Sequence, residues 1–197
     1  MMRLALSVLL AYVLGSIPFT YLAGWLRGLD LSRRGSGNLG GTNAIRVLGP
    51  FPGFLAGLAD VGKAALAVLI ARGLTDDYWS SALAAVAASL GHSYSLYLRL
   101  VKGGKGVSAV IGAFLFLAPL PTALGLAAAL GLVLVTRYVS LGSLVFVSLL
   151  PPLLLLFRQP LPWVAASAAM AILAFWRHRG NIRRLRQGTE RRIDERE

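Results

Sequence analysis

The chain has 197 residues, of which 56% are hydrophobic and 14% charged, and its formal net charge is +12. Soluble domains carry about 25% charged residues, so this composition excludes an ordinary soluble domain and indicates a polytopic membrane protein. The sequence has no cysteine, which excludes disulfides, thiolate catalysis and cysteine ligands for a metal. Two histidines are too few for a metal centre of their own, so we expect neither a metal nor a cofactor.

Six apolar runs reach or approach the roughly 20 residues that cross a bilayer. They are residues 4–26, 51–71, 78–98, 107–135, 138–157 and 161–176. Because no convincing small-residue cleavage site precedes Arg27, we expect the first run to be a retained span rather than a signal peptide. Pro119 and Pro121 can break the long fourth run into two short spans, which gives an all-α bundle of about seven transmembrane helices. A version with five spans, in which the fourth run is one tilted helix and the last two runs merge, stays open.

The basic residues predict the orientation of the spans, because Lys and Arg near span ends stay on the cytoplasmic side. They cluster after the first, third and last runs, as Arg27, Arg33, Arg34 and Arg46, then Arg99, Lys102 and Lys105, then eight arginines from Arg177 to Arg196. The connection 72–77 is not net positive and is expected outside. The N-terminus is therefore predicted outside, the C-terminus in the cytoplasm, and all three clusters on the cytoplasmic face.

The segment Lys102-Gly103-Gly104-Lys105-Gly106 lies between two apolar runs. Its glycines leave backbone N–H groups uncovered, its lysines add positive charge, and the run from Val107 supplies a helix N-terminus. This combination predicts an anion site, with phosphate as the expected anion. The alternative is a basic turn that touches lipid headgroups.

Residues 32–46, between the first two spans, are rich in Gly, Ser, Asn and Thr, which is a loop composition. Thr42 or Asn43 can cap a helix that carries Arg46 in its first turn. A solvated connector needs no chemistry, but the number of small hydrogen-bonding side chains near two or three arginines favours an anion-binding role.

A third polar segment, residues 178–190, opens the C-terminal tail. His178 and Asn181 recur at helical spacing, so both can face one site from one side of a helix. The alternative is an arginine-rich stretch on anionic lipid, which we prefer for the outer arginines. Ser140 and Ser143, at the start of the fifth run, share a helical face and can donate to a phosphate, although serine in a span is more often a packing residue.

Asp60 and Lys63 are ionisable residues one helical turn apart inside the second apolar run. An isolated charge there is unfavourable, so we expect the two side chains to pair and to face the bundle interior. His92, late in the third run, either lines the site or bonds a neighbour in the bundle. The pattern Gly53-x-x-x-Gly57 indicates close helix packing.

Three segments together carry a pattern that none carries alone. They are Gly35-Ser36-Gly37-Asn38-x-Gly40-x-Thr42-Asn43 with Arg46, Gly91-His92 followed by Lys102-Gly103-Gly104-Lys105-Gly106-Val107, and His178-x-x-Asn181-x-x-Arg184 with Gly188-Thr189-Glu190. In order and spacing they resemble the bacterial membrane acyl-phosphate:glycerol-3-phosphate acyltransferases of the PlsY type, over nearly the whole chain. The sequence departs from that family's pattern at Leu39, Gly41, Ala64 and Ser95, and none of these changes removes a charged or donor group.

The resemblance implies an enzyme that moves a fatty acyl group from a long-chain acyl phosphate to the sn-1 hydroxyl of glycerol 3-phosphate, giving lysophosphatidic acid and phosphate. This reaction is the first acylation of phospholipid biosynthesis. We expect a monomeric, multi-pass protein of the bacterial inner membrane with its active site at the cytoplasmic face. Residues 1–176 then form one catalytic helical bundle and residues 177–197 a basic cytoplasmic tail, whose start, 178–190, contributes to the site.

The catalytic residues expected in this chain are Ser36, Arg46, Lys105, His178 and Asn181. Those expected to bind substrate are Asn38, Thr42, Asn43, His92, Lys102, Gly103, Gly104, Gly106, Ser143 and Arg184. An acyl phosphate is already activated, so the protein need not supply a covalent nucleophile and mainly holds two anionic substrates together. The attacking hydroxyl can lose its proton to His178, to His92 or to a substrate phosphate. We favour the phosphate, because no His–carboxylate pair is evident at close spacing.

Other function classes fit less well. The histidine-to-aspartate signature of thioester-dependent acyltransferases is absent, because Tyr97 and Arg183 stand five positions beyond the two histidines. The main alternative is an organic-anion or phosphate transporter, but we find no repeat between the halves, and the polar residues gather at one interface. Nucleic-acid binding does not follow from the charge, because the basic residues sit at span ends with almost no soluble surface. The expected partners are the two substrates and membrane lipid.

Overall fold

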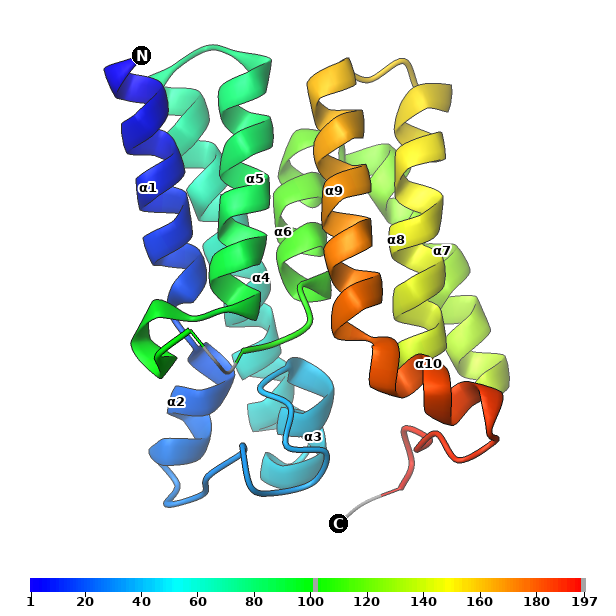
Figure 1. Ribbon diagram of the computed structural model, residues 1–197. Helices are drawn as coiled ribbons and strands as arrows, with labels where there is room; N and C mark the ends of the chain where they lie inside the picture. The colour runs from blue at the N-terminus through cyan, green and yellow to red at the C-terminus, as the bar shows by residue number, and fades with distance from the viewer. Residues whose placement is uncertain (101–102, 196–197) are drawn as a thin grey trace.

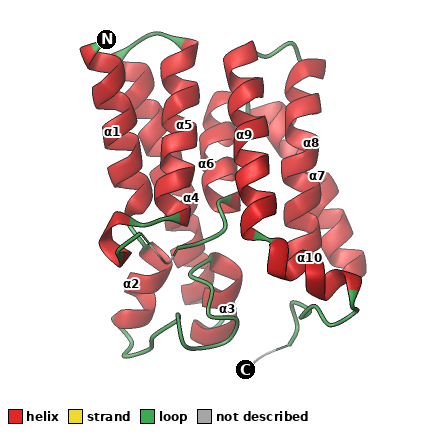
Figure 2. Cartoon of the chain, in the orientation of Figure 1, coloured by secondary structure: helices red, strands yellow, loops and turns green. Residues whose placement is uncertain are grey.

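The computed structural model describes residues 1–100 and 103–195, where the chain forms helices and connecting loops and no strand (Figures 1 and 2). In chain order the helices are α1 (Met2–Ser16), α2 (Phe19–Trp25), α3 (Gly41–Leu48), α4 (Pro50–Leu74), α5 (Tyr78–Ser93), the 3-10 turn η1 (Leu96–Leu98), α6 (Val107–Leu117), α7 (Pro119–Thr136), α8 (Val139–Leu156), α9 (Leu161–Arg177) and α10 (Arg179–Arg186). The predicted all-α class is confirmed.

Helices α1 and α4 to α9 run roughly along one direction, and α3 and α10 lie at the end opposite the N-terminus (Figure 1). Four stretches of the described chain are long and apolar enough to cross a membrane, namely Met2–Trp25, Pro50–Leu74, Pro119–Thr136 and Val139–Leu156. Helices α6 and α9 are apolar but shorter. These stretches support a multi-pass membrane protein, while the count of seven spans and their orientation stay predictions.

Two of the helix breaks lie where proline restricts the backbone. The predicted break in run 107–135 is confirmed, because α6 ends at Leu117 and α7 begins at Pro119. Run 4–26 is divided between α1 and α2, since Ile17 precedes Pro18 and adopts an extended conformation. Within run 78–98, α5 ends at Ser93 and the chain then turns through η1. The first residues of α6 and of α8 line the same cavity, so the chain leaves that end of the bundle in α6 and returns to it in α7.

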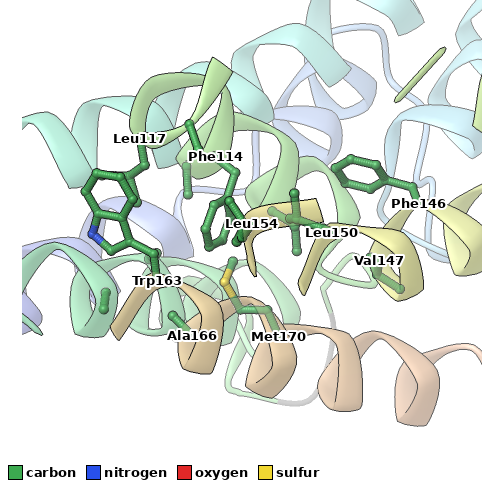
Figure 3. Close-up of a cluster of buried hydrophobic side chains, with 14 of the residues drawn as sticks. Phe114, Leu117, Phe146, Val147, Leu150, Leu154, Trp163, Ala166 and Met170 are labelled. Atoms are coloured by element: carbon green, nitrogen blue, oxygen red, sulfur yellow. The ribbon is translucent and has the colours of Figure 1, made fainter. Parts of the chain in front are cut away.

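The two halves of the bundle pack differently. Helices α6, α8 and α9 meet through large apolar side chains, including Phe114, Phe146, Leu150, Trp163 and Met170 (Figure 3). Helices α1, α4 and α5 meet mainly through buried alanines. Small side chains let helix backbones approach closely, so these three helices pack with little space between them.

Candidate active site

A cavity of about 290 Å³ opens at the end of the bundle where α3, α10 and the first turns of α6 and α8 meet. The predicted site residues that line it are Ser36, Asn38, Thr42, Asn43, Arg46, His92, Lys105, Ser143, His178, Asn181 and Arg184. Gly103, Gly104 and Gly106 are not among the lining residues. Lys102 lies outside the described residues. The three sequence segments therefore meet around one cavity.

A chain of hydrogen bonds crosses the cavity wall from Lys105 to Glu190. Lys105 Nζ donates to Asn181 Oδ1 over 2.5 Å, and Asn181 Nδ2 donates to Glu190 Oε1 over 2.5 Å. Ser140 Oγ donates to the same carboxylate over 2.7 Å, as does Arg184 Nε. One buried carboxylate thus orients side chains from the start of α8, from α10 and from the loop before α6.

The charges at this wall shift each other's pKa. The pKa of Lys105 is lowered to about 8, mainly by burial; the Glu190 carboxylate acts to raise it, and the charges of the neighbouring arginines add to the lowering. Burial also acts to raise the pKa of Glu190, but the hydrogen bonds that it accepts and the charge of Arg184 hold it below its usual value. Around Lys105, the positively charged arginines thus outnumber the one carboxylate. An anion that enters the cavity would favour its protonated form.

His178 is neutral near pH 7 and has a defined tautomer. It follows the last residue of α9 and precedes α10. Burial, followed by the charge of Lys105, lowers its pKa to about 4. Its Nδ1 lies 2.7 Å from Ala174 O, a carbonyl that can only accept, so Nδ1 carries the proton. Nε2 is then the acceptor of the ring.

Arg46 contacts the C-terminal segment, residues 190–195, which borders the cavity. Its Nε donates to Glu195 O over 2.9 Å, and Nη2 donates to Arg192 O over 3.4 Å. Ile193, a lining residue, donates its N–H to Arg137 O over 2.9 Å and so attaches the segment to the end of α7. Part of the predicted tail thus forms one wall of the site.

Helix α3, which carries Arg46, packs directly on the backbone of α4. A Cβ at Gly53 would lie 2.3 Å from Ile45 Cα, so the close packing predicted for Gly53 is confirmed. The capping prediction is wrong. Gly40 is the N-cap of α3 with no side-chain cap bond, Thr42 and Asn43 lie inside the helix, and Arg46 lies in its last turn.

The Asn43 side chain makes hydrogen bonds to the backbone of the loop that precedes α3. Its Oδ1 accepts the Ser36 N–H over 2.8 Å, and its Nδ2 donates to Arg34 O and Leu31 O over 3.1 and 3.3 Å. The side chain is 1% exposed. These bonds fix the backbone at Ser36, while the substrate contact predicted for Asn43 stays a prediction.

The glycines before α6 pack against α5. Gly104 donates its N–H to His92 O over 3.0 Å, so this amide, predicted to hold a phosphoryl group, is bonded inside the protein instead. A Cβ at Gly104 would lie 2.0 Å from His92 Nε2. Arg177 donates to the carbonyls of both Gly103 and Gly104 over 3.1 to 3.2 Å. These contacts set the position of Lys105, the next residue. The binding roles of Gly103 and Gly106 stay predictions.

Two residues that organise the site were not among the predicted catalytic or binding residues, although Glu190 stands in the third motif. Glu190 is the only carboxylate between positions 78 and 193 of the sequence, and this isolation among basic residues was a usable signal. Arg177 is one of eight arginines in the tail, and nothing in the sequence distinguishes it from the others.

The cavity combines cations, neutral donors and two imidazoles, and that of His178 presents an accepting nitrogen. Lys105, Arg46 and Arg184 supply positive charge, and Ser36, Thr42 and Ser143 add small hydroxyls. In the part of the chain that the structure describes, no three His, Asp or Glu side chains are placed to hold a metal ion. Such a set binds phosphate esters by charge-assisted hydrogen bonds.

Known proteins are similar to this chain in sequence and fold. Residues 5–188 match the family model described as glycerol-3-phosphate acyltransferase. The chain is 45% identical over 192 residues to the glycerol-3-phosphate acyltransferase of Thermus thermophilus, covering 96% of this chain and 95% of that protein. It is 41% identical over 189 residues to that of Carboxydothermus hydrogenoformans, covering 95% of each.

The fold matches two crystal structures of PlsY, described as an integral membrane glycerol 3-phosphate acyltransferase. The glycerol 3-phosphate form matches with a TM-score of 0.92 and 35% identity, covering 96% of this chain and 94% of that chain. The lysophosphatidic acid form matches with a TM-score of 0.90 and 34% identity over the same shares. With a family model that covers most of its length and relatives above 40% identity, the chain belongs to the glycerol-3-phosphate acyltransferase family, and it is an integral membrane acyltransferase.

Proposed function

We propose that this acyltransferase takes a fatty acyl group from a long-chain acyl phosphate and transfers it to the sn-1 hydroxyl of glycerol 3-phosphate, releasing lysophosphatidic acid and phosphate. It acts as a monomer of seven spans in the bacterial inner membrane, with its N-terminus outside and the cavity open to the cytoplasm. The observation that carries the proposal is that Lys105, Arg46 and Arg184 line the same cavity as several neutral donors. The glycerol 3-phosphate and lysophosphatidic acid forms of the PlsY relative support the acceptor and the product.

Positive charge is the main requirement of this reaction. Both substrates carry a phosphate, so their approach is opposed by repulsion that cationic side chains must offset. Lys105 and Arg46 belong to two different sequence segments, and both line the cavity. Burial and the neighbouring arginines lower the pKa of Lys105 to about 8, and a bound phosphate would favour its charged form.

The chemical step needs no covalent intermediate on the protein. The glycerol hydroxyl oxygen bonds to the acyl carbonyl carbon, and the bond between that carbon and the phosphate oxygen breaks. The hydroxyl proton passes to a phosphate oxygen of the substrate. The Lys105 ammonium and the Arg46 guanidinium stabilise the negative charge on the departing phosphate and on the carbonyl oxygen.

His178 orients the acceptor rather than taking its proton. A base with a pKa of about 4 holds a proton poorly near pH 7. Its Nε2 can accept a hydrogen bond from the glycerol hydroxyl and direct the oxygen toward the carbonyl. A His178→Ala variant should then retain measurable turnover. Complete loss of turnover with glycerol 3-phosphate binding intact would assign the proton to His178.

The function is tested by phosphate release from purified protein in lipid mesophase or micelles, given palmitoyl phosphate with and without glycerol 3-phosphate. We expect release that requires both substrates and disappears in Lys105→Ala. Arg184 and Arg183 are neighbours on α10, and only Arg184 lines the cavity. Arg184→Ala should therefore lower activity, whereas Arg183→Ala should match wild type. Release without glycerol 3-phosphate, or no release at all, would contradict the proposal.

A further inference from the structure

Asp60 and Lys63 form a buried ion pair inside α4, one of the helices long enough to span a membrane. Lys63 Nζ lies 2.6 Å from Asp60 Oδ1, and the residues are 5% and 1% exposed. The pairing predicted from the sequence is confirmed. Neither residue is among those that line the cavity. Charged residues inside a span are expected to serve function or assembly, so the contacts of the pair indicate its role.

On one side the pair is linked to residues 32–41, the loop that brings neutral donors to the cavity. Lys63 Nζ donates over 2.5 Å to Ile17 O, in the extended segment between α1 and α2. Thr20, in α2, lies beside the carboxylate of the pair. The Thr20 hydroxyl donates to Leu39 O over 2.8 Å, and this bond attaches the loop to α2.

On the other side the pair is linked to residues 103–106, the loop that carries Lys105. His92 Nδ1 lies 3.8 Å from Asp60 Oδ1. The main-chain oxygen of His92 accepts the Gly104 N–H over 3.0 Å, and its imidazole lies directly against Gly104. A shift of the imidazole would therefore move the loop.

We propose that the Asp60–Lys63 pair is a positioning element that holds residues 32–41 and 103–106 at the separation that acyl transfer needs. It acts through Thr20 and His92 and touches neither substrate. The first loop follows α2 and the second precedes α6, and the Asp60–Lys63 pair of α4 lies between their contacts. The proposal rests on the proposed function, because the separation of the loops matters most when two substrates must meet in one geometry.

The competing explanation is an ion pair that only stabilises the packing of α4. The double variant Asp60→Asn/Lys63→Met separates the two, because it keeps the side-chain sizes and removes both charges together. Each single change leaves an unpaired buried charge and is expected to lower thermal stability strongly, whereas the double variant should recover it. The positioning role expects the folded double variant to lose kcat/KM for glycerol 3-phosphate by about tenfold or more, with a raised KM. Wild-type kinetics in the folded double variant would overturn it.

Thr20→Val tests the same link without any change of charge, and it decides the matter if the double variant does not fold. The replacement keeps the side-chain shape and removes the bond to Leu39 O. The matched control is Thr122→Val in α7. Thr122 is equally buried, and its hydroxyl bonds Phe114 O and Ala118 O, neither of which lines the cavity. We expect KM to rise about threefold or more in Thr20→Val alone. Identical kinetics in wild type and both variants would overturn the proposal.

The two proposals fail in different ways in these measurements. If wild-type protein shows no phosphate release that depends on glycerol 3-phosphate, the proposed function is wrong. If wild type is active and the folded double variant or Thr20→Val has the same kcat and KM, only the positioning role is wrong.

Discussion

Replacement of Gly104 by alanine is the sharpest test of how the loop before α6 is held. A Cβ there would lie 2.0 Å from His92 Nε2, whereas ordinary van der Waals contact begins at 3.4 Å. Gly104 is not among the glycines with positive φ, so alanine fits its backbone conformation. The whole effect of the substitution therefore comes from this one contact, which must open by about 1.4 Å.

The magnitude follows from what moves. The imidazole is 5% exposed, and Arg177 holds the carbonyls of the loop, so neither side has room to give. If the loop takes up the shift, the 2.5 Å contact between Lys105 Nζ and Asn181 Oδ1 lengthens to about 3.9 Å, beyond hydrogen-bonding range. A displacement of about 1 Å at a reacting site lowers rates about 100-fold. We expect that loss in kcat/KM, with about 1–3 kcal/mol of lost stability.

The assay is phosphate release from palmitoyl phosphate and glycerol 3-phosphate, normalised to folded protein. Gly131→Ala in α7 is the matched control, because a Cβ at Gly131 meets nothing within 4 Å. It should keep wild-type kinetics and gain up to about 1 kcal/mol of stability. In the Gly104→Ala background, His92→Ala removes the obstacle, so the double variant should be no less active than His92→Ala alone. Wild-type kcat/KM in Gly104→Ala, or a double variant well below His92→Ala, would refute the reasoning.

Three further predictions concern charge. Because the pKa of Lys105 is about 8 and its protonated form binds phosphate, kcat/KM for glycerol 3-phosphate should fall about tenfold per pH unit above pH 8; a flat profile to pH 9.5 would contradict this. The substrate phosphate, with a second pKa of about 6, does not titrate in that range. Glu190→Gln removes a charge that raises the pKa of Lys105, so the midpoint of the same profile should move to lower pH, and an unchanged or higher midpoint would argue against the coupling. Asp194→Asn breaks an ion pair with Arg137 whose side chains are 52% and 58% exposed, so melting and kcat/KM should change little, by less than about twofold in kcat/KM. A tenfold loss would mean that the C-terminal segment depends on that pair.

Much of the fold was predictable because a membrane imposes simple rules on sequence. The apolar runs became helices, and the break at Pro119 was predicted from the missing N–H and fixed φ of proline. The division between α1 and α2 follows from the same rule at Pro18, where the length of the apolar run concealed it. Apolar length therefore located the long helices, and proline accounts for two of the breaks between them.

The roles of the glycines could not be predicted from the sequence. A glycine exposes its amide and also permits close approach, and both uses give the same sequence pattern. For Gly104 the outcome depends on where His92 lies, twelve residues earlier and at the end of another helix. The predicted cap at Thr42 or Asn43 failed for a related reason, because Asn43 finds three partners in the preceding loop, which the sequence does not place.

The position of Glu190 follows from the charge of the site as well as from the sequence motifs. Lys105 and Asn181 are 76 positions apart, and both were predicted for the site from separate segments. Their contact depends on the turn after α10, where Gly188 adopts φ of 68° and brings Glu190 back against Asn181. The positive charges of Lys105 and of the arginines around the cavity repel one another, so a nearby carboxylate is favoured there. One carboxylate offsets part of that repulsion and leaves the excess positive charge that an anionic substrate needs, which explains why the isolated acid of a basic tail is buried at this site.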